Sequence, residues 1–295
     1  MTTHLPRIKA TMAIHSHRKV RGLLQGEYAS TSVGRSMDLN DLREYVRGDD
    51  VRDIDWKASA RGGQMLVKRF VATRKHTILV VVSTGRSMAA VNDRLLPKRD
   101  LAVYVAGVVG WLAVRHGDLV GVAYGDADGH RVRPASGGEL RLEDSLGAVH
   151  DAITPDSAAA DLAGLLEHVA RVVRRRRTIM VVVSDEHALD YRLADALDRA
   201  RAQHEVLFVT LGDLDPTRPL ARALTDVDSG AALPEWMRGD ARLEREYADR
   251  LAADALGLRA GLARLGIPHE RVADHQSAVP AIFRLLERHR HARRR

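Results

Sequence analysis

Thr77–Ser83, which reads TILVVVS, and Thr178–Ser184, which reads TIMVVVS, are the two stretches that decide the fold. Each is a continuous run of apolar, mostly β-branched residues, which is typical of a strand covered on both faces of a sheet. Two further runs, Leu119–Tyr124 (LVGVAY) and Glu205–Leu211 (EVLFVTL), predict two more strands. Because strands covered on both faces occur mainly in parallel sheets, these runs indicate an α/β protein.

Segments with helical spacing separate the predicted strands. The longest apolar run, Leu101–Val114, lies in a predicted buried helix at Pro97–Arg115 and is shorter than the roughly 20 residues of a membrane span. The other expected elements are helices at Leu140–Ile153, Asp161–Arg174, Leu189–Gln203, Asp240–Leu265 and Ser277–Arg290, and short strands at His130–Pro134 and Ile267–Val272. This order predicts βαβ units and a mostly parallel sheet with helices on both faces. Ligands of such sheets bind beyond the carboxyl ends of the strands, so the segments after Val82, Val183 and Val209 are the candidate binding loops.

Composition excludes several classes of site. The 295 residues include no cysteine, which excludes disulfides, thiolate metal sites and a cysteine nucleophile. Only 4% of the residues are aromatic, which argues against a base-stacking surface for nucleic acid. Met1–Lys19 is basic and polar and has no apolar stretch typical of a signal peptide. We therefore expect a cytoplasmic protein.

The strand–helix alternation begins only at residue 77, which predicts three parts. Residues 1–76 form an N-terminal segment that we expect to pack on the main domain, burying Trp56, Leu66, Val67 and Phe70. Residues 77–284 form the α/β domain, and residues 285–295 form a basic tail. We expect His289, in this tail, to be exposed to solvent.

The N-terminal segment contains a dense pattern of acids and bases between residues 43 and 61. Each acid has an arginine within a few residues, which favours a structural Asp–Arg network that fixes an irregular loop. The alternative is a metal-dependent phosphodiester hydrolase, in which Asp50, Asp53 and Asp55 hold Mg²⁺ through oxygen ligands. The signature positions are Arg43, Glu44, Tyr45, Gly48, Asp49, Asp50, Arg52, Asp55, Trp56 and Arg61.

This pattern resembles the signature of the family called domain of unknown function 58. The matching stretches are Gly26–Ser30, Arg43–Tyr45, Gly48–Asp50, Arg52, Ile54–Trp56, Ser59–Arg61 and Val67–Phe70. The resemblance implies a Rossmann-like sheet of the von Willebrand factor type A kind. Many members are encoded beside AAA+ ATPases of the MoxR type, which implies a role as an adaptor linked to a chaperone.

Type A domains often carry a metal-ion-dependent adhesion site, and the resemblance assigns its positions here to Ser83, Gly85, Ser87, Ala160 and Asp185. Such a site surrounds Mg²⁺ with carboxylate and hydroxyl oxygens. In this chain Ser83 stands where the pattern has Asp, and Gly85 and Ala160 stand where it has hydroxyl residues. We therefore expect a degenerate site, with no cofactor and no bound metal.

These observations predict a non-enzymatic protein-interaction module, with a MoxR-type AAA+ ATPase as its partner and a client protein that the sequence does not identify. No G-x-x-x-x-G-K-[ST] loop is present in the chain, so we expect the ATPase to be a separate protein. A nucleic-acid-binding module that uses the basic ends and Arg174–Arg177 is a further alternative, in which affinity would fall steeply with salt.

Overall fold

The computed structural model describes residues 3–19, 37–47, 49–72, 76–173, 177–186, 188–217, 224–232, 234–237 and 239–292. The chain divides into two compact units. Unit 1 comprises Met1–Gln25 and His76–Arg295, and unit 2 comprises Gly26–Lys75. The division differs from the predicted boundary at residue 76, because residues 1–25 group with the α/β unit.

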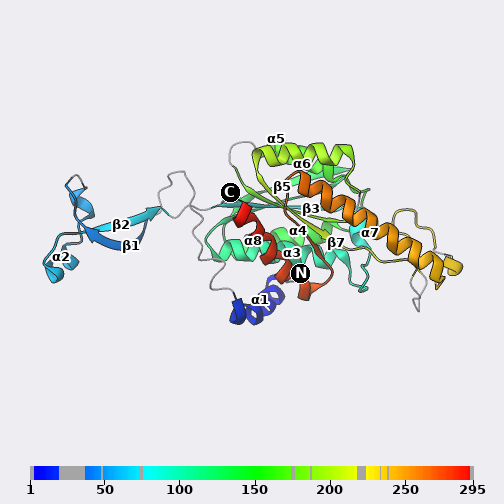
Figure 1. Ribbon diagram of the computed structural model, residues 1–295, viewed down its shortest axis with the longest axis horizontal. Coiled ribbons are helices and arrows are strands. Elements are labelled where there is room, and N and C mark those ends of the chain that lie inside the picture. The colour runs from blue at the N-terminus through cyan, green and yellow to red at the C-terminus, as the bar shows by residue number, and fades with distance from the viewer. Residues whose placement is uncertain are drawn as a thin grey trace. The chain divides into compact units, whose positions relative to one another are not determined.

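Unit 1 is built on a six-stranded sheet with the order β5-β4-β3-β6-β7-β8 (Figure 1). The strands are β3 (Thr77–Ser83), β4 (Leu119–Asp126), β5 (Gly129–Ser136), β6 (Ile179–Asp185), β7 (Glu205–Leu211) and β8 (His269–Val272). All neighbouring strands are parallel except β4 and β5, which form an antiparallel hairpin. The predicted α/β class and mostly parallel sheet are therefore confirmed.

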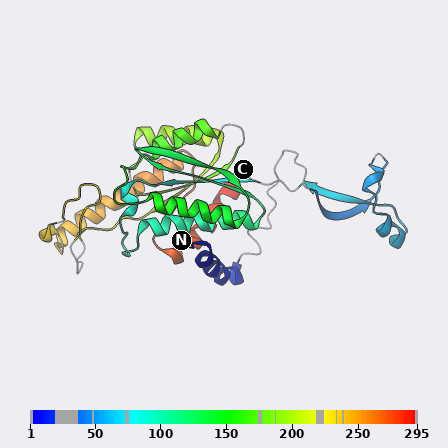
Figure 2. The same cartoon turned by 180° about the vertical axis from the view of Figure 1, so that it is seen from behind.

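Helices cover both faces of this sheet, as Figures 1 and 2 show from opposite sides. The helices of unit 1 are α1 (Leu5–Lys19), α3 (Lys98–Arg115), α4 (Glu139–Ala152), α5 (Leu162–Val172), α6 (Tyr191–Gln203), α7 (Ala241–Arg264) and α8 (His275–Ala292), with the short 3-10 helices η2 (Arg86–Ala89) and η3 (Glu235–Met237). Successive strand residues point to opposite faces, so β3 contributes Val80 and Val82 to one core and Leu79 and Val81 to the other. The first core also contains α1, α3, α4 and α8, and the second contains α5, α6 and α7.

Helix α3 is the buried centre of the first core. It is apolar on all sides, and its residues from Leu101 to Ala113 are buried. Such a helix needs cover on its outer side, and α1 supplies part of it through Leu5, Ile8 and Met12. A side chain at Gly107 of α3 would lie 2.1 Å from the Cδ1 atom of Ile8, so the two helices make close contact. The N-terminal helix is therefore a structural part of the α/β unit.

Unit 2 is a small antiparallel hairpin with two short helices. Strand β1 (Met37–Glu44) pairs with β2 (Leu66–Ala72), and η1 (Val51–Asp53) and α2 (Trp56–Gly62) lie in the connection between them. Ile54 and Val67 are buried and form a bridge across the connection. Trp56, in contrast, is 64% exposed. A two-stranded hairpin with a seven-residue helix has no second layer of its own to cover the ring, so burial of Trp56 against the main domain stays a prediction.

The C-terminal segment is more ordered than a frayed tail. Helix α8 continues to Ala292, and His289 is 6% exposed, with its Nε2 atom 2.7 Å from a carboxylate oxygen of Glu205. The predicted exposure of His289 is therefore wrong, because the helix packs its last turns on the sheet. Arg284 and Arg288 both form ion pairs with Glu270, which neutralises part of the basic charge.

Candidate functional site at the carboxyl edge of the sheet

The order of the strands places a binding position at the carboxyl edge of β3 and β6. The chain passes from β3 to β4 on one side of β3, and then returns to β6 on its other side. The loops after β3 and β6 therefore leave the sheet in opposite directions and open a crevice between them. This is the edge at which the sequence predicts the candidate binding loops.

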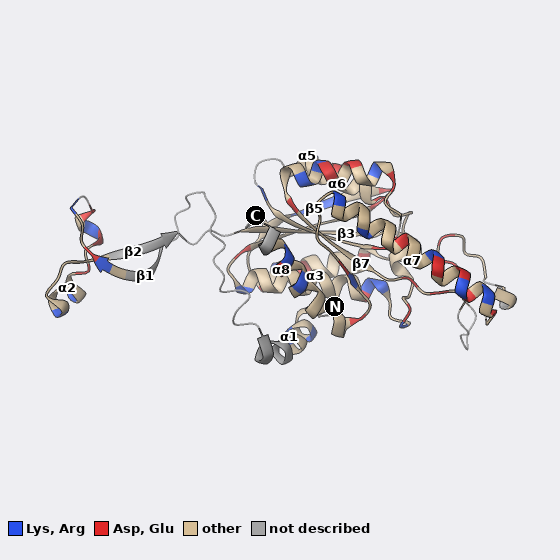
Figure 3. Cartoon of the chain, in the orientation of Figure 1, with Lys and Arg blue, Asp and Glu red and all other residues tan. Residues whose placement is uncertain are grey.

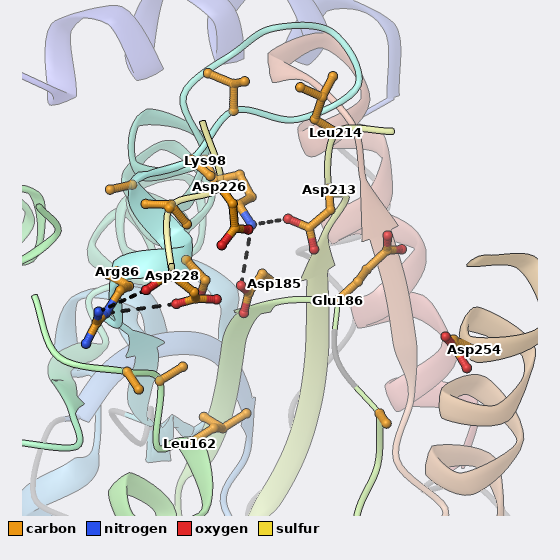
Figure 4. A pocket seen from close by; sticks show the side chains of 18 of the residues that line it. Arg86, Lys98, Leu162, Asp185, Glu186, Asp213, Leu214, Asp226, Asp228 and Asp254 are labelled. Atoms are coloured by element: carbon orange, nitrogen blue, oxygen red, sulfur yellow. Dashed lines mark hydrogen bonds and ion pairs between the residues drawn. The ribbon is translucent and has the colours of Figure 1, made fainter. Parts of the chain in front are cut away.

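A cavity of about 1430 Å³ lies at this edge (Figure 4). Its walls come from η2, the start of α3, the loop before α5, the ends of β6 and β7, the segment 224–230 and helix α7. Ser87, Ala160 and Asp185, three of the predicted positions, line it, whereas Ser83, which ends β3, and Gly85, in the loop after β3, are not among its lining residues. The structure thus brings the predicted positions together at one edge of the sheet.

The side chain of Lys98 is the cation at the centre of this site. Its ammonium forms ion pairs with Asp185, at 3.4 Å from Oδ2, and with Asp213 (Figure 4). The Lys98 side chain is 2% exposed and that of Asp185 is 7% exposed, whereas that of Asp213 is 31% exposed. Asp185 ends β6 and Asp213 follows β7, so two adjacent parallel strands deliver both carboxylates to one ammonium.

The electrostatic balance of this cluster is negative, since two carboxylates share one ammonium. Burial raises the pKa of the Asp213 carboxyl, while the Lys98 ammonium acts in the opposite direction and the neighbouring carboxylates of Asp185 and Glu186 raise the pKa further. Burial and the nearby carboxylates, Asp213 first among them, also raise the pKa of Tyr247 on α7. An unpaired charge in such a position would be strongly unfavourable, which makes the Lys98 contacts essential to the cluster.

The loop after β3 has no room for a side chain at Gly85. A Cβ atom there would lie 2.5 Å from both the Cα and N atoms of Ala160. The loop is held in this approach by backbone hydrogen bonds from Arg86 to Ala158 and from Ala127 to Ala159, each of 2.9 Å. Glycine at position 85 therefore follows from the close contact of two backbones.

The donors at the five predicted positions do not fit a divalent cation. Ser83 and Ser87 offer neutral hydroxyls, whose Oγ atoms are buried without a hydrogen-bond partner in the described part of the chain. Gly85 and Ala160 offer no side-chain oxygen, and Oδ2 of Asp185 is paired with Lys98. Mg²⁺ requires a near-octahedral set of oxygen ligands and sheds its water reluctantly, so neutral hydroxyls alone would not hold it. Within the described ranges, no group of three or more His, Asp or Glu side chains is arranged to hold a metal ion.

Arg86, which lines the cavity, contacts the segment 224–230. Its Nη1 atom donates to the backbone oxygen of Asp228 at 3.4 Å, and its Nε atom lies 3.9 Å from a carboxylate oxygen of the same residue (Figure 4). Arg192 of α6, which also lines the cavity, donates to Asp161 at 2.9 Å. Asp161 in turn caps α5 by accepting from the backbone N–H of Gly164. The rim of the cavity is therefore lined by ion pairs that a partner could contact.

The signature residues of unit 2 are engaged in local structure. Arg43 pairs with Asp49 at 2.5 Å, and this contact, with the backbone N–H of Val46, lowers the pKa of the Asp49 carboxyl. Asp50 caps η1, and Asp55 caps α2 by accepting from the backbone N–H groups of residues 57 and 58. Their carboxylates thus serve two different helix ends, which supports the structural interpretation over the Mg²⁺ site.

The remaining signature positions lie along the same connection. Glu44 ends β1, the N–H of Tyr45 donates to Met65 at 2.8 Å, the N–H of Arg52 donates to Asp50, Asp53 ends η1, and Arg61 lies exposed in the last turn of α2. Gly48 and the stretch Gly26–Ser30 lie outside the described residues.

Acidic and basic residues alternate on two of the described surface helices. Figure 3 shows acidic and basic residues mixed along α5 and α7. Arg177 pairs with Glu205 at 3.5 Å, while residues 174–176 lie outside the described part. The described part also contains no helix long and apolar enough to cross a bilayer.

Sequence reasoning missed Lys98 and Asp213. Lys98 lies within the predicted helix Pro97–Arg115, and Asp213 lies just after the predicted strand Glu205–Leu211, but neither was assigned a role. A signal for Lys98 was present, because a cation in the first turn of a helix opposes the helix dipole and needs a compensating partner.

A comparison with protein families finds a match to the family described as "Protein of unknown function DUF58" over residues 41–252. The matched range contains the signature positions from Arg43 onward, Lys98, Asp185 and Asp213, whereas Gly26–Ser30 lies before it. Among curated proteins, the chain is 28% identical over 209 residues to an uncharacterized protein of Mycobacterium tuberculosis, Rv1480. The match covers 70% of this chain and 64% of that protein, so the chain spans less than two thirds of the length of this relative.

Solved structures give weaker matches. An aerotolerance-related membrane protein of Bacteroides fragilis aligns with a TM-score of 0.44 and 14% identity, over 72% of this chain and 98% of that one. A von Willebrand factor type A protein of Catenulispora acidiphila aligns with a TM-score of 0.39 and 11% identity, over 74% of this chain and 43% of that one.

Proposed function

The chain belongs to the family of proteins of unknown function DUF58, and we propose that it is a non-enzymatic interaction module that docks a protein partner at the carboxyl edge of its sheet. The observation that carries this proposal is the cavity at the β3–β6 crossover. The ion pairs of Lys98 with Asp185 and Asp213 form part of its wall. A rim of ion pairs around an accessible cavity suits recognition of a protein surface, in which charges set orientation and specificity.

We propose that the five positions Ser83, Gly85, Ser87, Ala160 and Asp185 form a degenerate metal-ion-dependent adhesion site. Two of its hydroxyls are replaced by residues without oxygen, and its carboxylate is paired with an ammonium. Docking then depends on shape and on the charges of the rim, and no bridging cation takes part. We therefore expect the affinity for the partner to be unchanged by chelators.

The partner that we propose is an AAA+ ATPase of the MoxR type, acting with this chain in the cytoplasm. The support is the family membership and the absence from the sequence of a phosphate-binding loop with the pattern G-x-x-x-x-G-K-[ST], so that the energy of ATP would enter through a second protein. The client on which the pair acts is a separate protein, and the chain's role is to bring client and ATPase together.

Affinity measurements with paired charge reversals test this function. The chain is immobilised, and binding of a purified MoxR-type ATPase from the same host is measured for the wild type, for Arg192→Glu and for Arg199→Glu. Both arginines lie on α6, are exposed and pair with an aspartate, but Arg192 lines the cavity and Arg199 does not. Reversal of a rim charge is expected to weaken binding about tenfold, through a slower association and a faster dissociation.

Arg199→Glu is the matched control and is expected to bind like the wild type. Equal affinities for all three proteins would reject the cavity as the docking site. Absence of any interaction between the wild-type chain and the ATPase would reject the proposed partner.

A further inference from the structure

Lys98 occupies a position that local preferences do not favour. It is the first residue of α3, where the partial positive charge of the helix N-terminus repels a cation. Its side chain is buried, although lysine is almost never fully buried without a partner. Neither the helix N-terminus nor the buried environment therefore favours a lysine at this position. Such conflicts are often found at residues that belong to a functional site.

The contacts of Lys98 explain how the conflict is resolved. Its ammonium lies between Asp185 and Asp213, which come from the ends of two adjacent strands. Asp185 also accepts from the hydroxyl of Ser184 through its other oxygen, at 3.3 Å. Both carboxylates thus pair with the Lys98 ammonium, whose side chain is enclosed by protein.

We infer that the Lys98 ammonium is the resident cation of this site, and that it takes the place a divalent ion would need between Asp185 and Asp213. The inference rests on the proposed docking site and adds the reason for its independence of metal. A cation that is part of the chain cannot be removed by chelation and does not vary with the metal content of the cell. Because the Lys98 side chain is 2% exposed, its ammonium is also not presented to a carboxylate of a partner.

Removing the charge should therefore destabilise the chain, and removing one carboxylate with it should restore stability. In Lys98→Met, whose unbranched side chain is one atom shorter, the buried carboxylate of Asp185 and the partly exposed carboxylate of Asp213 lose the ammonium between them, and we expect the midpoint of thermal unfolding to fall by about 10 °C. In Asp213→Asn the ammonium keeps Asp185 as a partner, so the fall is expected to be smaller. The double variant should unfold at a higher temperature than Lys98→Met alone.

Truncation tests whether the ammonium fills the place of a divalent ion. Lys98→Ala empties the space between the two carboxylates, so about 10 mM MgCl₂ should raise its unfolding midpoint by about 3–5 °C relative to NaCl of the same ionic strength. The wild type and Lys98→Met, in which ammonium or methionine fills the space, should show no such rise.

The outcomes of these unfolding experiments support or refute the inference, and none of them requires a binding partner. Recovery of stability in the double variant, or of soluble yield if Lys98→Met does not fold, supports the charge compensation. Lys98→Met as stable as the wild type, no recovery in the double variant, or an equal response of wild type and Lys98→Ala to MgCl₂ would overturn the inference. Because every readout uses the purified chain, its failure is distinguishable from failure of the docking proposal.

Discussion

Substitution of Gly85 by alanine is expected to destabilise the loop that closes the site. The added Cβ atom would lie 2.5 Å from two backbone atoms of Ala160 and 2.8 Å from its Cβ atom, well inside the distance of ordinary contact. These are not the far ends of flexible side chains, because the segment is fixed by the backbone hydrogen bonds of Ala158 and Ala159. Relief requires a shift of the backbone, which costs about 1–3 kcal/mol in overpacked sites.

The assay is thermal unfolding followed by circular dichroism. For a unit of this size, a loss of 1–3 kcal/mol lowers the unfolding midpoint by about 3–10 °C. Gly147→Ala is the matched control, since an added Cβ at this position in α4 meets nothing within 4 Å. Because alanine is favoured over glycine inside a helix by about 1 kcal/mol, the control is expected to be at least as stable as the wild type.

Gly85→Ser, which restores the hydroxyl of the type A pattern, is expected to behave like Gly85→Ala and to gain no response to Mg²⁺. An unfolding midpoint equal to that of the wild type in Gly85→Ala would refute the close contact of the two loops. Stabilisation of Gly85→Ser by Mg²⁺ would contradict the expectation that a hydroxyl restored at position 85 does not create a metal site.

Three further changes test other parts of the structure. Ile8→Ala removes a fully buried contact between α1 and α3 and should cost about 2–4 kcal/mol in the free energy of unfolding of unit 1; unchanged stability would mean that α1 does not pack on the core. Asp55→Ala removes the cap of α2 and should cost about 1 kcal/mol, seen as faster proteolysis within unit 2, whereas Asp53→Ala should have a smaller effect. Burial lowers the pKa of His269 to about 4, so the neutral imidazole contributes about 3 kcal/mol of stability above pH 6.5 that is lost as the pH falls toward 4; His269→Asn should flatten this part of the stability profile, and an unaltered profile would contradict the shift.

The α/β core was predictable from the sequence because its strands are nearly pure runs of β-branched residues. TILVVVS and TIMVVVS became β3 and β6, with ends within a residue of the predicted ones. The apolar run at Leu101–Val114 became the buried part of α3, and its length alone separated it from a membrane span. In these elements the local pattern and the tertiary burial agree.

The N-terminal helix and the hairpin unit were harder to predict. Helix α1 is rich in basic and polar residues, and among its described side chains Leu5, Ile8 and Met12, at intervals of three and four residues, mark the buried face. Trp56 was expected to be buried against the main domain; unit 2 has no second layer of its own to cover the ring, so that expectation stays a prediction. The sequence shows that a large aromatic residue is present, but it does not show whether another element of the fold covers that residue.

The candidate site was also predictable only in part. Ser83, Gly85, Ser87, Ala160 and Asp185 could be placed at one edge because the ends of parallel strands meet there. The pairing of Lys98 with Asp185 and Asp213 could not, because it joins residues 87 and 115 positions apart in the chain. Nothing in local spacing specifies such a contact, which forms only when α3 packs against the sheet.

Titration of the purified wild-type chain with Mn²⁺, followed by electron paramagnetic resonance, tests most directly whether the site binds a divalent metal ion. If the Lys98 ammonium holds Asp185 and Asp213, the signal of free Mn²⁺ should be the same with and without protein at submillimolar concentrations. One Mn²⁺ ion bound per chain, and lost again in Asp185→Asn, would contradict the account.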